Sequence, residues 1–273
     1  MTAPLVTLQA PRPVPDVVAE IGRGGPALVA LSGGVDSALV ASLAAEALGA
    51  RAVAVTLEGP AVSRAEVERA RAVARAIGIA HRVVPVDPLA RPEYRANPAD
   101  RCYHCRVVET AALRSFGTPG AIAQYLDGVQ LDDLGDDRPG IRAMDEAGFA
   151  HPLVWAGWRK SEVRARARER GLPNWDQPSD ACLASRIAHG RSIDAPLLRR
   201  IESAEAWLRA QGFRQVRVRV DGEDARIEVG AEQVARLEGA PWADRAVGEL
   251  GRLGFRRVTI DPRGYRPSGG PAR

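Results

Sequence analysis

The feature that most constrains this chain is a glycine-rich turn between an apolar run and a helical stretch. Residues 27–31 are continuously apolar and predict a buried strand, and residues 37–48 predict a helix. Further strands and one amphipathic helix are expected at 52–57, 63–77, 81–87 and 121–126. Strands that alternate with helices form a parallel sheet covered on both faces. The expected fold class is therefore α/β with a parallel sheet.

The pattern changes near residue 191. Helices are expected at 195–211 and 243–253, and strands at 216–220, 225–229 and 256–260. We interpret this part as a small α+β domain for substrate binding or oligomerisation. The expected division is a flexible N-terminal segment at 1–17, an α/β domain at 18–190, the small domain at 191–266 and a disordered tail at 267–273.

Composition excludes several classes of protein. Hydrophobic residues make up 45% of the 273 residues and charged residues 26%, which is ordinary globular composition. No apolar run approaches the roughly 20 residues of a membrane span, and the start does not resemble a secretory signal. The three cysteines do not suit a disulfide framework, so we expect a cytoplasmic protein.

The net charge of +4 comes almost entirely from arginine, since Lys160 is the only lysine. An RNA-binding face combines basic clusters with stacking aromatic residues, but aromatic residues are only 5% of this chain and widely spread. Arginine also binds phosphate through its planar fork. A small phosphorylated substrate is therefore as natural a partner as nucleic acid.

The turn itself has the composition of a phosphate-binding loop. Glycines let the backbone approach phosphate oxygens, and the amides at the start of the following helix point at the anion. The loop has no Gly-Lys-Ser/Thr sequence and so is not a Walker A loop. It resembles instead the PP-loop of the ATP pyrophosphatase superfamily, through Ser32, Gly33, Gly34, Asp36 and Ser37.

This resemblance implies that the loop holds the pyrophosphate of ATP while an acceptor oxygen attacks the α-phosphorus. It also implies an acidic patch for Mg²⁺ after the strand at 121–126, where hard oxygen ligands suit that ion. Asp127 and Gly128 are expected to bind ATP, and Asp132 and Asp133 to bind Mg²⁺. Thr56 is expected to contact adenine through its backbone.

The cysteines form a second group of candidates. Cys102 and Cys105 make a Cys-x-x-Cys pair, and Cys182 follows much later; we expect all three in loops at the ligand edge of the sheet. Such a spacing lets two thiolates face one metal. His104 and His189 are the nearest histidines; each is either a fourth ligand or a loop residue, and we favour the loop interpretation.

Together these motifs resemble one family, the LarE family of ATP-dependent sulfur transferases. The resemblance runs from about residue 18 to about 266 and rests on residues 32–37, 100–105, 137–140, 182–186, 216–219 and 225–228. It implies adenylation of pyridinium-3,5-biscarboxylic acid mononucleotide and replacement of oxygen by sulfur, in synthesis of the nickel-pincer nucleotide. It also implies a homo-oligomer.

The family's sulfur chemistry takes two forms. In one, a lone cysteine near the position of Cys182 gives up its own sulfur; in the other, three cysteines hold a [4Fe-4S] cluster. This chain has three cysteines, so the resemblance implies the cluster form, with Cys102, Cys105 and Cys182 as ligands. The sulfide source is not readable from the sequence.

Arginines of the small domain are candidates for holding the substrate phosphate. Arg217 and Arg219 lie two apart on an expected strand, so their side chains share a face. Ser185 and Arg186 follow Cys182 and add donors. The resemblance places Glu205 near the reaction site, as a catalytic candidate.

Two other functions fit parts of the sequence. A tRNA-thiolating enzyme uses the same loop and a similar cysteine set, although it predicts a basic and aromatic RNA-binding domain that is not evident here. A non-catalytic zinc or iron–sulfur module would use the cysteines with one histidine. Metal content and tRNA binding separate these alternatives.

Overall fold

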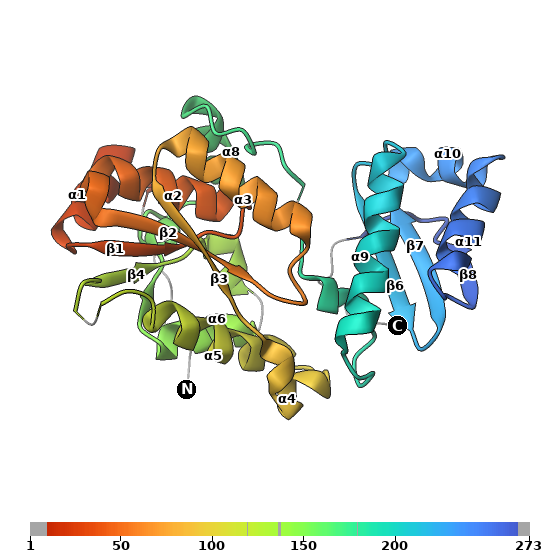
Figure 1. The fold of residues 1–273 in the computed structure, drawn as a ribbon. Coiled ribbons are helices and arrows are strands. Elements are labelled where there is room, and N and C mark those ends of the chain that lie inside the picture. Colours follow the sequence, from red (N-terminus) through yellow and green to blue (C-terminus); the bar gives the residue numbers. More distant parts are fainter. Residues whose placement is uncertain (1–9, 119, 136–137, 179, 267–273) are drawn as a thin grey trace, which may run out of the picture. The chain divides into compact units, whose positions relative to one another are not determined.

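The computed structural model describes residues 10–118, 120–135, 138–178 and 180–266. They form two compact units (Figure 1). Within the described residues, unit 1 comprises 10–59, 64–86 and 102–178, and unit 2 comprises 60–63, 87–101 and 180–266. The expected boundary after residue 190 thus falls inside unit 2, which takes up the chain again at Asp180.

Unit 1 is built on a five-stranded parallel sheet with the strand order β3-β2-β1-β4-β5. Its strands are β1 Ala27–Ala30, β2 Ala52–Glu58, β3 Ala80–Pro85, β4 Gln124–Leu126 and β5 Phe149–Ala150. The central strand β1 is flanked by β2 and β4, and the order reverses at this point. Ligands of open α/β sheets bind at such a switch, beyond the carboxyl ends of the strands.

Helices cover both faces of this sheet (Figure 1). They are α1 Val14–Arg23, α2 Val35–Leu48, α3 Arg64–Ile77, α5 Arg101–Arg114, α6 Pro139–Glu146, α7 Pro152–Trp155 and α8 Lys160–Glu169. One core includes side chains of α1, α2, α3, α7 and α8, and a second includes Leu113 of α5 and Met144 of α6. The α/β fold class with a parallel sheet is confirmed.

Helix α1 corrects one expectation. Residues 14–17 were expected in a flexible segment, but they open a helix whose Val17 and Ile21 are fully buried. Proline is accepted in the first helical turn, because its missing N–H would have no intrahelical partner there. The prolines of this segment therefore mark a helix start. The expectations for residues 1–9 and for the tail at 267–273 lie outside the described residues.

Unit 2 contains a three-stranded sheet with the order β6-β7-β8, in which β6 and β7 are antiparallel and β8 is parallel to β7. Its elements are α4 Pro92–Arg95, α9 Ala195–Ala210, β6 Val216–Asp221, β7 Asp224–Val229, α10 Val234–Glu238, α11 Trp242–Arg252 and β8 Arg257–Ile260. The side chains of Val216, Val218 and Val220 are buried. The expected α+β character is confirmed.

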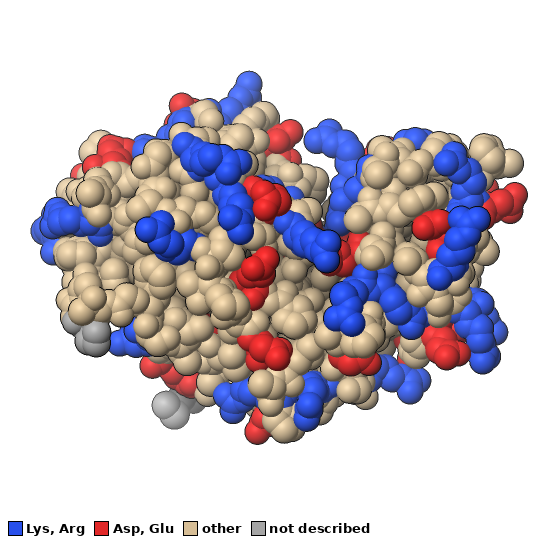
Figure 2. All heavy atoms as spheres, viewed as in Figure 1, with Lys and Arg blue, Asp and Glu red and all other residues tan. Residues whose placement is uncertain are grey.

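Charged side chains are scattered over the face of the molecule drawn in Figure 2. On the face drawn in Figure 2, basic groups are interleaved with acidic ones. Within the described residues, no helix combines the length and the apolar character that crossing a membrane requires.

Candidate active site

The glycine-rich loop leads from β1 directly into α2. Ser32 and Ser37 hold it closed: the Ser32 amide donates to Ser37 Oγ at 3.2 Å, and the Ser37 hydroxyl lies within hydrogen-bonding distance of the Gly34 carbonyl, at 3.2 Å. Gly34 is the N-cap of α2 and has no side chain with which to occupy the first amides of the helix. The start of a 14-residue helix therefore faces the loop with amides suited to phosphate oxygens.

Gly33 is required by both conformation and space. Its φ is +80°, in the left-handed region, and a Cβ there would lie 2.9 Å from the Ala70 amide nitrogen of α3. The Gly33 carbonyl accepts a 2.8 Å hydrogen bond from the buried side-chain amide of Asn174. Asn174 follows α8, so a distant segment fixes the shape of the loop.

Asp36 lies in the first turn of α2 and pairs with Lys160, the first residue of α8. Burial raises the pKa of Asp36, against the opposing effect of Lys160. The second carboxylate oxygen, Oδ1, is buried and accepts no hydrogen bond from any residue that the structure describes. This oxygen lacks a partner at the place where phosphate is expected.

Asp127 follows β4 and lies beside the same helix start. A Cβ on the next residue, Gly128, would lie 2.6 Å from the Ser37 amide nitrogen, so the two backbones are in close contact. Asp127 Oδ1 lies 2.7 Å from His151 Nδ1 and accepts the Val129 amide. Its Oδ2 is buried and has no hydrogen-bond partner among the described residues.

His151 bridges two carboxylates, because its Nε2 lies 2.7 Å from Asp145 Oδ1. Burial acts to lower the pKa of His151, but the hydrogen bonds and charges of Asp127 and Asp145 raise it to about 9. At neutral pH His151 is therefore charged and forms ion pairs with Asp127 and Asp145.

Asp132 and Asp133 are engaged differently from Asp127. Asp132 accepts from the Arg159 side chain at 2.6 Å and from the Lys160 amide at 2.9 Å. Asp133 accepts hydrogen bonds from the Arg138 side chain at 2.5 Å and from the Gln130 backbone amide at 3.1 Å. All four oxygens of these two carboxylates thus have protein donors.

Thr56 is buried near the end of β2 and supports the strand before the loop. Its hydroxyl donates to the Leu31 carbonyl at 2.7 Å, and so it accepts from His81 Nε2 at 2.8 Å. Burial, followed by the charge of Arg71, lowers the pKa of His81. Both hydrogen bonds of the Thr56 hydroxyl are therefore made within the protein. The expected contact to adenine involves the Thr56 backbone and not this hydroxyl.

The cysteine pair corrects another expectation. Cys102 and Cys105 were expected in a loop but lie in the first turns of α5, which begins at Arg101. Glycine and proline are absent from the helix sequence, so nothing interrupts it after Pro98. Residues three apart share a helix face, and the two thiols therefore point to the same side.

The surroundings of the three thiols differ. Cys102 is exposed, and Cys105 donates to Glu109 at 3.3 Å. Cys182 belongs to unit 2, in a loop before a 3₁₀ turn at Leu183–Arg186, as expected. Within the described parts of the chain, no three His, Cys, Asp or Glu side chains are grouped as a metal site.

The two candidate histidines also occupy different settings. His104 lies in α5, where its ring contacts Tyr103 edge-to-face. His189 donates from Nδ1 to the Pro98 carbonyl at 3.1 Å. Asp137, part of one quoted motif, lies outside the described residues.

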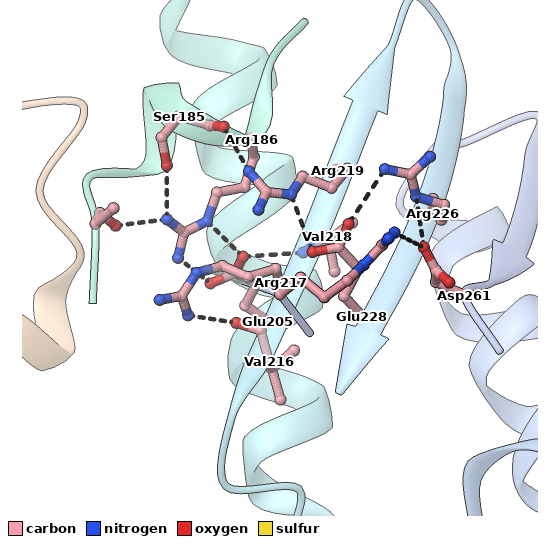
Figure 3. Close-up of polar contacts among 12 residues, drawn as sticks. Ser185, Arg186, Glu205, Val216, Arg217, Val218, Arg219, Arg226, Glu228 and Asp261 are labelled. Carbon is pink, nitrogen blue, oxygen red and sulfur yellow. Dashed lines mark hydrogen bonds and ion pairs between the residues drawn. The ribbon is translucent and has the colours of Figure 1, made fainter. Parts of the chain in front are cut away.

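Unit 2 carries a network of arginines and carboxylates (Figure 3). At its centre Arg186 and Glu205 are 2% and 0% exposed and are joined by hydrogen bonds of 2.8 and 3.1 Å. Glu205 also accepts from Arg209 and from the Val218 amide. Burial acts to lower the pKa of Arg186, but Glu205 and Asp180 outweigh it and raise that pKa. Through the hydrogen bond from the Val218 amide, Glu205 links α9 to β6.

The two strand arginines join this network from β6. Arg217 is 3% exposed and lies 3.2 Å from Asp180; burial and the charge of Arg186 lower its pKa. Arg219 donates to Glu228 at 3.1 Å and to the Ser185 carbonyl at 3.0 Å. Ser185 Oγ accepts from Arg186 at 2.9 Å. The structure therefore brings together, in unit 2, the four residues expected to bind the substrate phosphate.

Three residues near the loop were not predicted from the sequence as site residues: Asn174, His151 and Lys160. A lone lysine among 38 basic residues was a usable signal for Lys160. No comparable signal marks Asn174 or His151, because their contacts join segments far apart in the sequence.

Comparison with known proteins agrees with this geometry. A family model described as NAD synthase matches residues 13–100. The chain is 42% identical to the uncharacterized protein slr1717 of Synechocystis sp., over 88% of this chain and 90% of that protein.

Two relatives have named activities. The pyridinium-3,5-bisthiocarboxylic acid mononucleotide synthase of Lactiplantibacillus plantarum is 33% identical over 87% of this chain and 86% of its own. A tRNA-specific 2-thiouridylase of Rhizorhabdus wittichii is 39% identical, over 52% of this chain and 38% of its own.

Proposed function

The chain belongs to the LarE family of ATP-dependent sulfurtransferases, and we propose that it inserts sulfur into pyridinium-3,5-biscarboxylic acid mononucleotide. The observation that carries the proposal is the closed loop at residues 32–37, which presents the start of α2 beside two buried carboxylate oxygens without hydrogen-bond partners in the described chain. The similarity to the pyridinium-3,5-bisthiocarboxylic acid mononucleotide synthase extends over 87% of this chain and 86% of that protein.

The proposed chemistry has two steps. A substrate carboxylate oxygen attacks the α-phosphorus of ATP, the bond from that phosphorus to the bridging oxygen breaks, and pyrophosphate leaves with the electron pair. A sulfur nucleophile then adds to the carbonyl carbon and expels AMP. In the first step the amides of α2 and the loop bind the pyrophosphate, and the hydroxyls of Ser32 and Ser37 fix the loop.

Mg²⁺ fits Asp36 and Asp127 better than the residues expected from the sequence. Each of these two has a buried carboxylate oxygen without a hydrogen-bond partner in the described chain, and hard anionic oxygen is the donor that Mg²⁺ prefers. Asp132 and Asp133 are already bonded to protein donors. Mg²⁺ there would neutralise charge on the leaving pyrophosphate.

The arginine network of unit 2 suits the phosphate of the mononucleotide. Arg217 and Arg219 are held by carboxylates and carbonyls, so little side-chain entropy would be lost on binding. Ser185 and Arg186 complete the proposed phosphate site. For Glu205 we propose a positioning role, since it is fully buried and bonded to Arg186, Arg209 and β6.

For the sulfur, we propose a [4Fe-4S] cluster held by Cys102, Cys105 and Cys182. The donor chemistry fits, because thiolates are the usual ligands of such clusters and the first two share one face of α5. When bound, the cluster would supply an iron able to hold exchangeable sulfide. Cys102→Ala should abolish iron–sulfur absorbance in anaerobically purified protein; one complete turnover by that variant, with Cys182 converted to dehydroalanine, would favour sacrifice of Cys182.

A tRNA-thiolating enzyme is the second candidate, because of the matches to 2-thiouridylases over about half of this chain. On the face drawn in Figure 2, basic and acidic side chains are interleaved, and this face therefore does not favour binding to the phosphates of tRNA. Incubation with ATP, Mg²⁺ and the mononucleotide should form AMP and pyrophosphate, and tRNA should not stimulate that reaction. Release of ADP and phosphate would contradict adenylation, and stimulation by tRNA alone would favour the thiouridylase function.

A further inference from the structure

The turn after β8 has no part in the function argued so far, yet both of its ends are bonded to β7. Asp261 at its start is 2% exposed, and its amide donates to the Ile227 carbonyl at 2.8 Å. Tyr265 at its end donates from its amide to the Val229 carbonyl at 2.7 Å. Within the turn, Asp261 Oδ1 accepts the Arg263 amide at 3.0 Å. The position of the Tyr265 backbone is therefore set by β7.

Gly264 lets the turn lie this close to the strand. Its φ is +67°, in the left-handed region, and a Cβ there would lie 2.8 Å from the Val229 carbonyl oxygen and 3.0 Å from the Ala231 Cα. Its amide donates to the Asp261 carbonyl at 3.0 Å. Any other residue at position 264 would therefore displace the turn, and Tyr265 with it.

The Tyr265 ring lies against Arg217, one of the arginines proposed to hold the substrate phosphate. The guanidinium carbon of Arg217 is 5.0 Å from the ring centroid, within the range of a cation–π contact. Arg217 is 3% exposed, so this contact is made away from water, where it is strongest. The contact is made by the aromatic ring and does not need the Tyr265 hydroxyl.

The surroundings of Arg217 explain why a ring is useful there. Burial and the positive charge of Arg186 both lower the pKa of Arg217, and Asp180 at 3.2 Å opposes them. The electron-rich face of an aromatic ring also favours a cation, and it does so without accepting an N–H donor. Because the donors of a guanidinium lie in its plane, a ring on its face fixes that plane and occupies none of them.

We propose that Tyr265 is a positioning residue for the substrate phosphate: its ring holds the Arg217 guanidinium in the plane from which it donates to phosphate oxygens. The inference rests on the proposed binding of the mononucleotide phosphate by unit 2. Tyr265 acts through Arg217 and takes no part in adenylation or sulfur transfer. Loss of the ring should therefore weaken binding of the phosphate group and leave the chemical steps at saturating substrate unchanged.

The first test compares binding of pyridinium-3,5-biscarboxylic acid mononucleotide with binding of the corresponding nucleoside, which lacks the phosphate. Calorimetry should show that Tyr265→Leu weakens mononucleotide binding about 5- to 30-fold, the range for loss of a desolvated cation–π contact. Binding of the nucleoside should be unchanged. Tyr265→Phe keeps the ring and should bind both ligands like the unmodified chain.

Tyr125→Leu is the matched control. Tyr125 of unit 1 makes the same kind of contact with Arg114, whose guanidinium carbon is 4.8 Å from the ring centroid. This variant loses a tyrosine ring from an arginine outside the proposed phosphate site. It should bind the mononucleotide like the unmodified chain.

The second test asks whether the ring acts through Arg217. In an Arg217→Met background, Tyr265→Leu should change the mononucleotide affinity by less than about twofold, because its partner is already gone. In the enzyme assay, Tyr265→Leu alone should raise KM for the mononucleotide by the factor found in calorimetry, with kcat within about twofold of the unmodified chain.

The outcomes separate the possible failures. Equal loss of nucleoside and mononucleotide binding in Tyr265→Leu would mean that Tyr265 only supports the fold of unit 2, and would overturn the inference. Undiminished mononucleotide binding by that variant, or an equal further loss in the Arg217→Met background, would overturn it as well. Failure of the unmodified chain to bind the mononucleotide would instead refute the proposed function on which the inference rests.

Discussion

The phosphate loop of unit 1 and the arginine network of unit 2 both hold charged groups in buried positions, but they distribute hydrogen bonds differently. In the network, Glu205 accepts from three partners and Glu228 from two arginines. At the loop, Asp36 Oδ1 and Asp127 Oδ2 are buried and lack a hydrogen-bond partner in the described chain. A buried polar atom without a partner is costly and is retained where a ligand supplies one.

The comparison separates carboxylates that stabilise the fold from carboxylates that lack a partner until a ligand binds. Glu205 and Glu228 of the network have protein partners, so removing Glu205 should chiefly destabilise unit 2. The loop is incomplete without ligand, so changing its carboxylates should chiefly affect ATP use. Variants of the two regions should therefore separate loss of stability from loss of ATP use.

Glu205→Ala should lower the free energy of unfolding by about 3–5 kcal/mol, because it leaves the buried Arg186 without its main partner. Urea unfolding of the purified protein measures this. The control is Glu223→Ala, which removes an exposed pair with Arg256 and should cost under about 1 kcal/mol. Similar stabilities for both variants would show that the network does not support the fold.

Asp36→Asn should give the opposite pattern. Because Asn cannot supply the same anionic oxygen to Mg²⁺, ATP-dependent AMP formation should fall about 100-fold. Its pair with Lys160 is partly exposed, so unfolding should change by under about 1 kcal/mol. A variant that is unstable but fully active would place Asp36 among the structural groups.

The pKa of His151 predicts a pH-dependent stability in metal-free protein. Since folding raises this pKa from 6.5 to about 9, the stabilisation is complete below pH 6.5 and is lost as the pH rises through 9. The loss is up to about 3 kcal/mol. Urea unfolding in EDTA should follow this decline, and His151→Gln should lack it. A wild-type curve parallel to that of the variant would exclude the bridged imidazolium.

Asn174→Ala should have the smallest effect. It removes one hydrogen bond to the Gly33 carbonyl and should cost about 1–2 kcal/mol of stability, with weaker ATP binding as the loop loosens. Gln177→Ala is the control in the same segment, because Arg164 bonds to the backbone of residue 177, which the substitution keeps. If both variants bind ATP equally well, Asn174 does not shape the loop.

The sequence predicted the parallel sheet and the phosphate loop well, because both depend on local patterns. The strand and helix around residues 27–48 follow from apolar runs and glycine. Two predictions of local structure were wrong because tertiary packing decides these segments. The prolines at the start of α1 were interpreted as part of a flexible segment. The cysteine pair was assigned to a loop, although α5 begins at Arg101.

The same distinction applies to the candidate site. Residues 32–37 form one contiguous motif and could be predicted together. The partners of that motif, Lys160, Asn174 and His151, come from segments joined only by folding. The sequence indicated Asp132 and Asp133 as Mg²⁺ ligands, but could not show that arginines and backbone amides bond to both.

Adenylation of the substrate carboxylate is the central claim, and an isotope experiment tests it most directly. The mononucleotide is labelled with ¹⁸O in its carboxylates and incubated with the enzyme, ATP, Mg²⁺ and a sulfide source, and the AMP is analysed by mass spectrometry. Attack by a carboxylate oxygen on the α-phosphorus predicts one ¹⁸O atom in AMP and none in pyrophosphate. Unlabelled AMP, or ADP with labelled phosphate, would contradict the account.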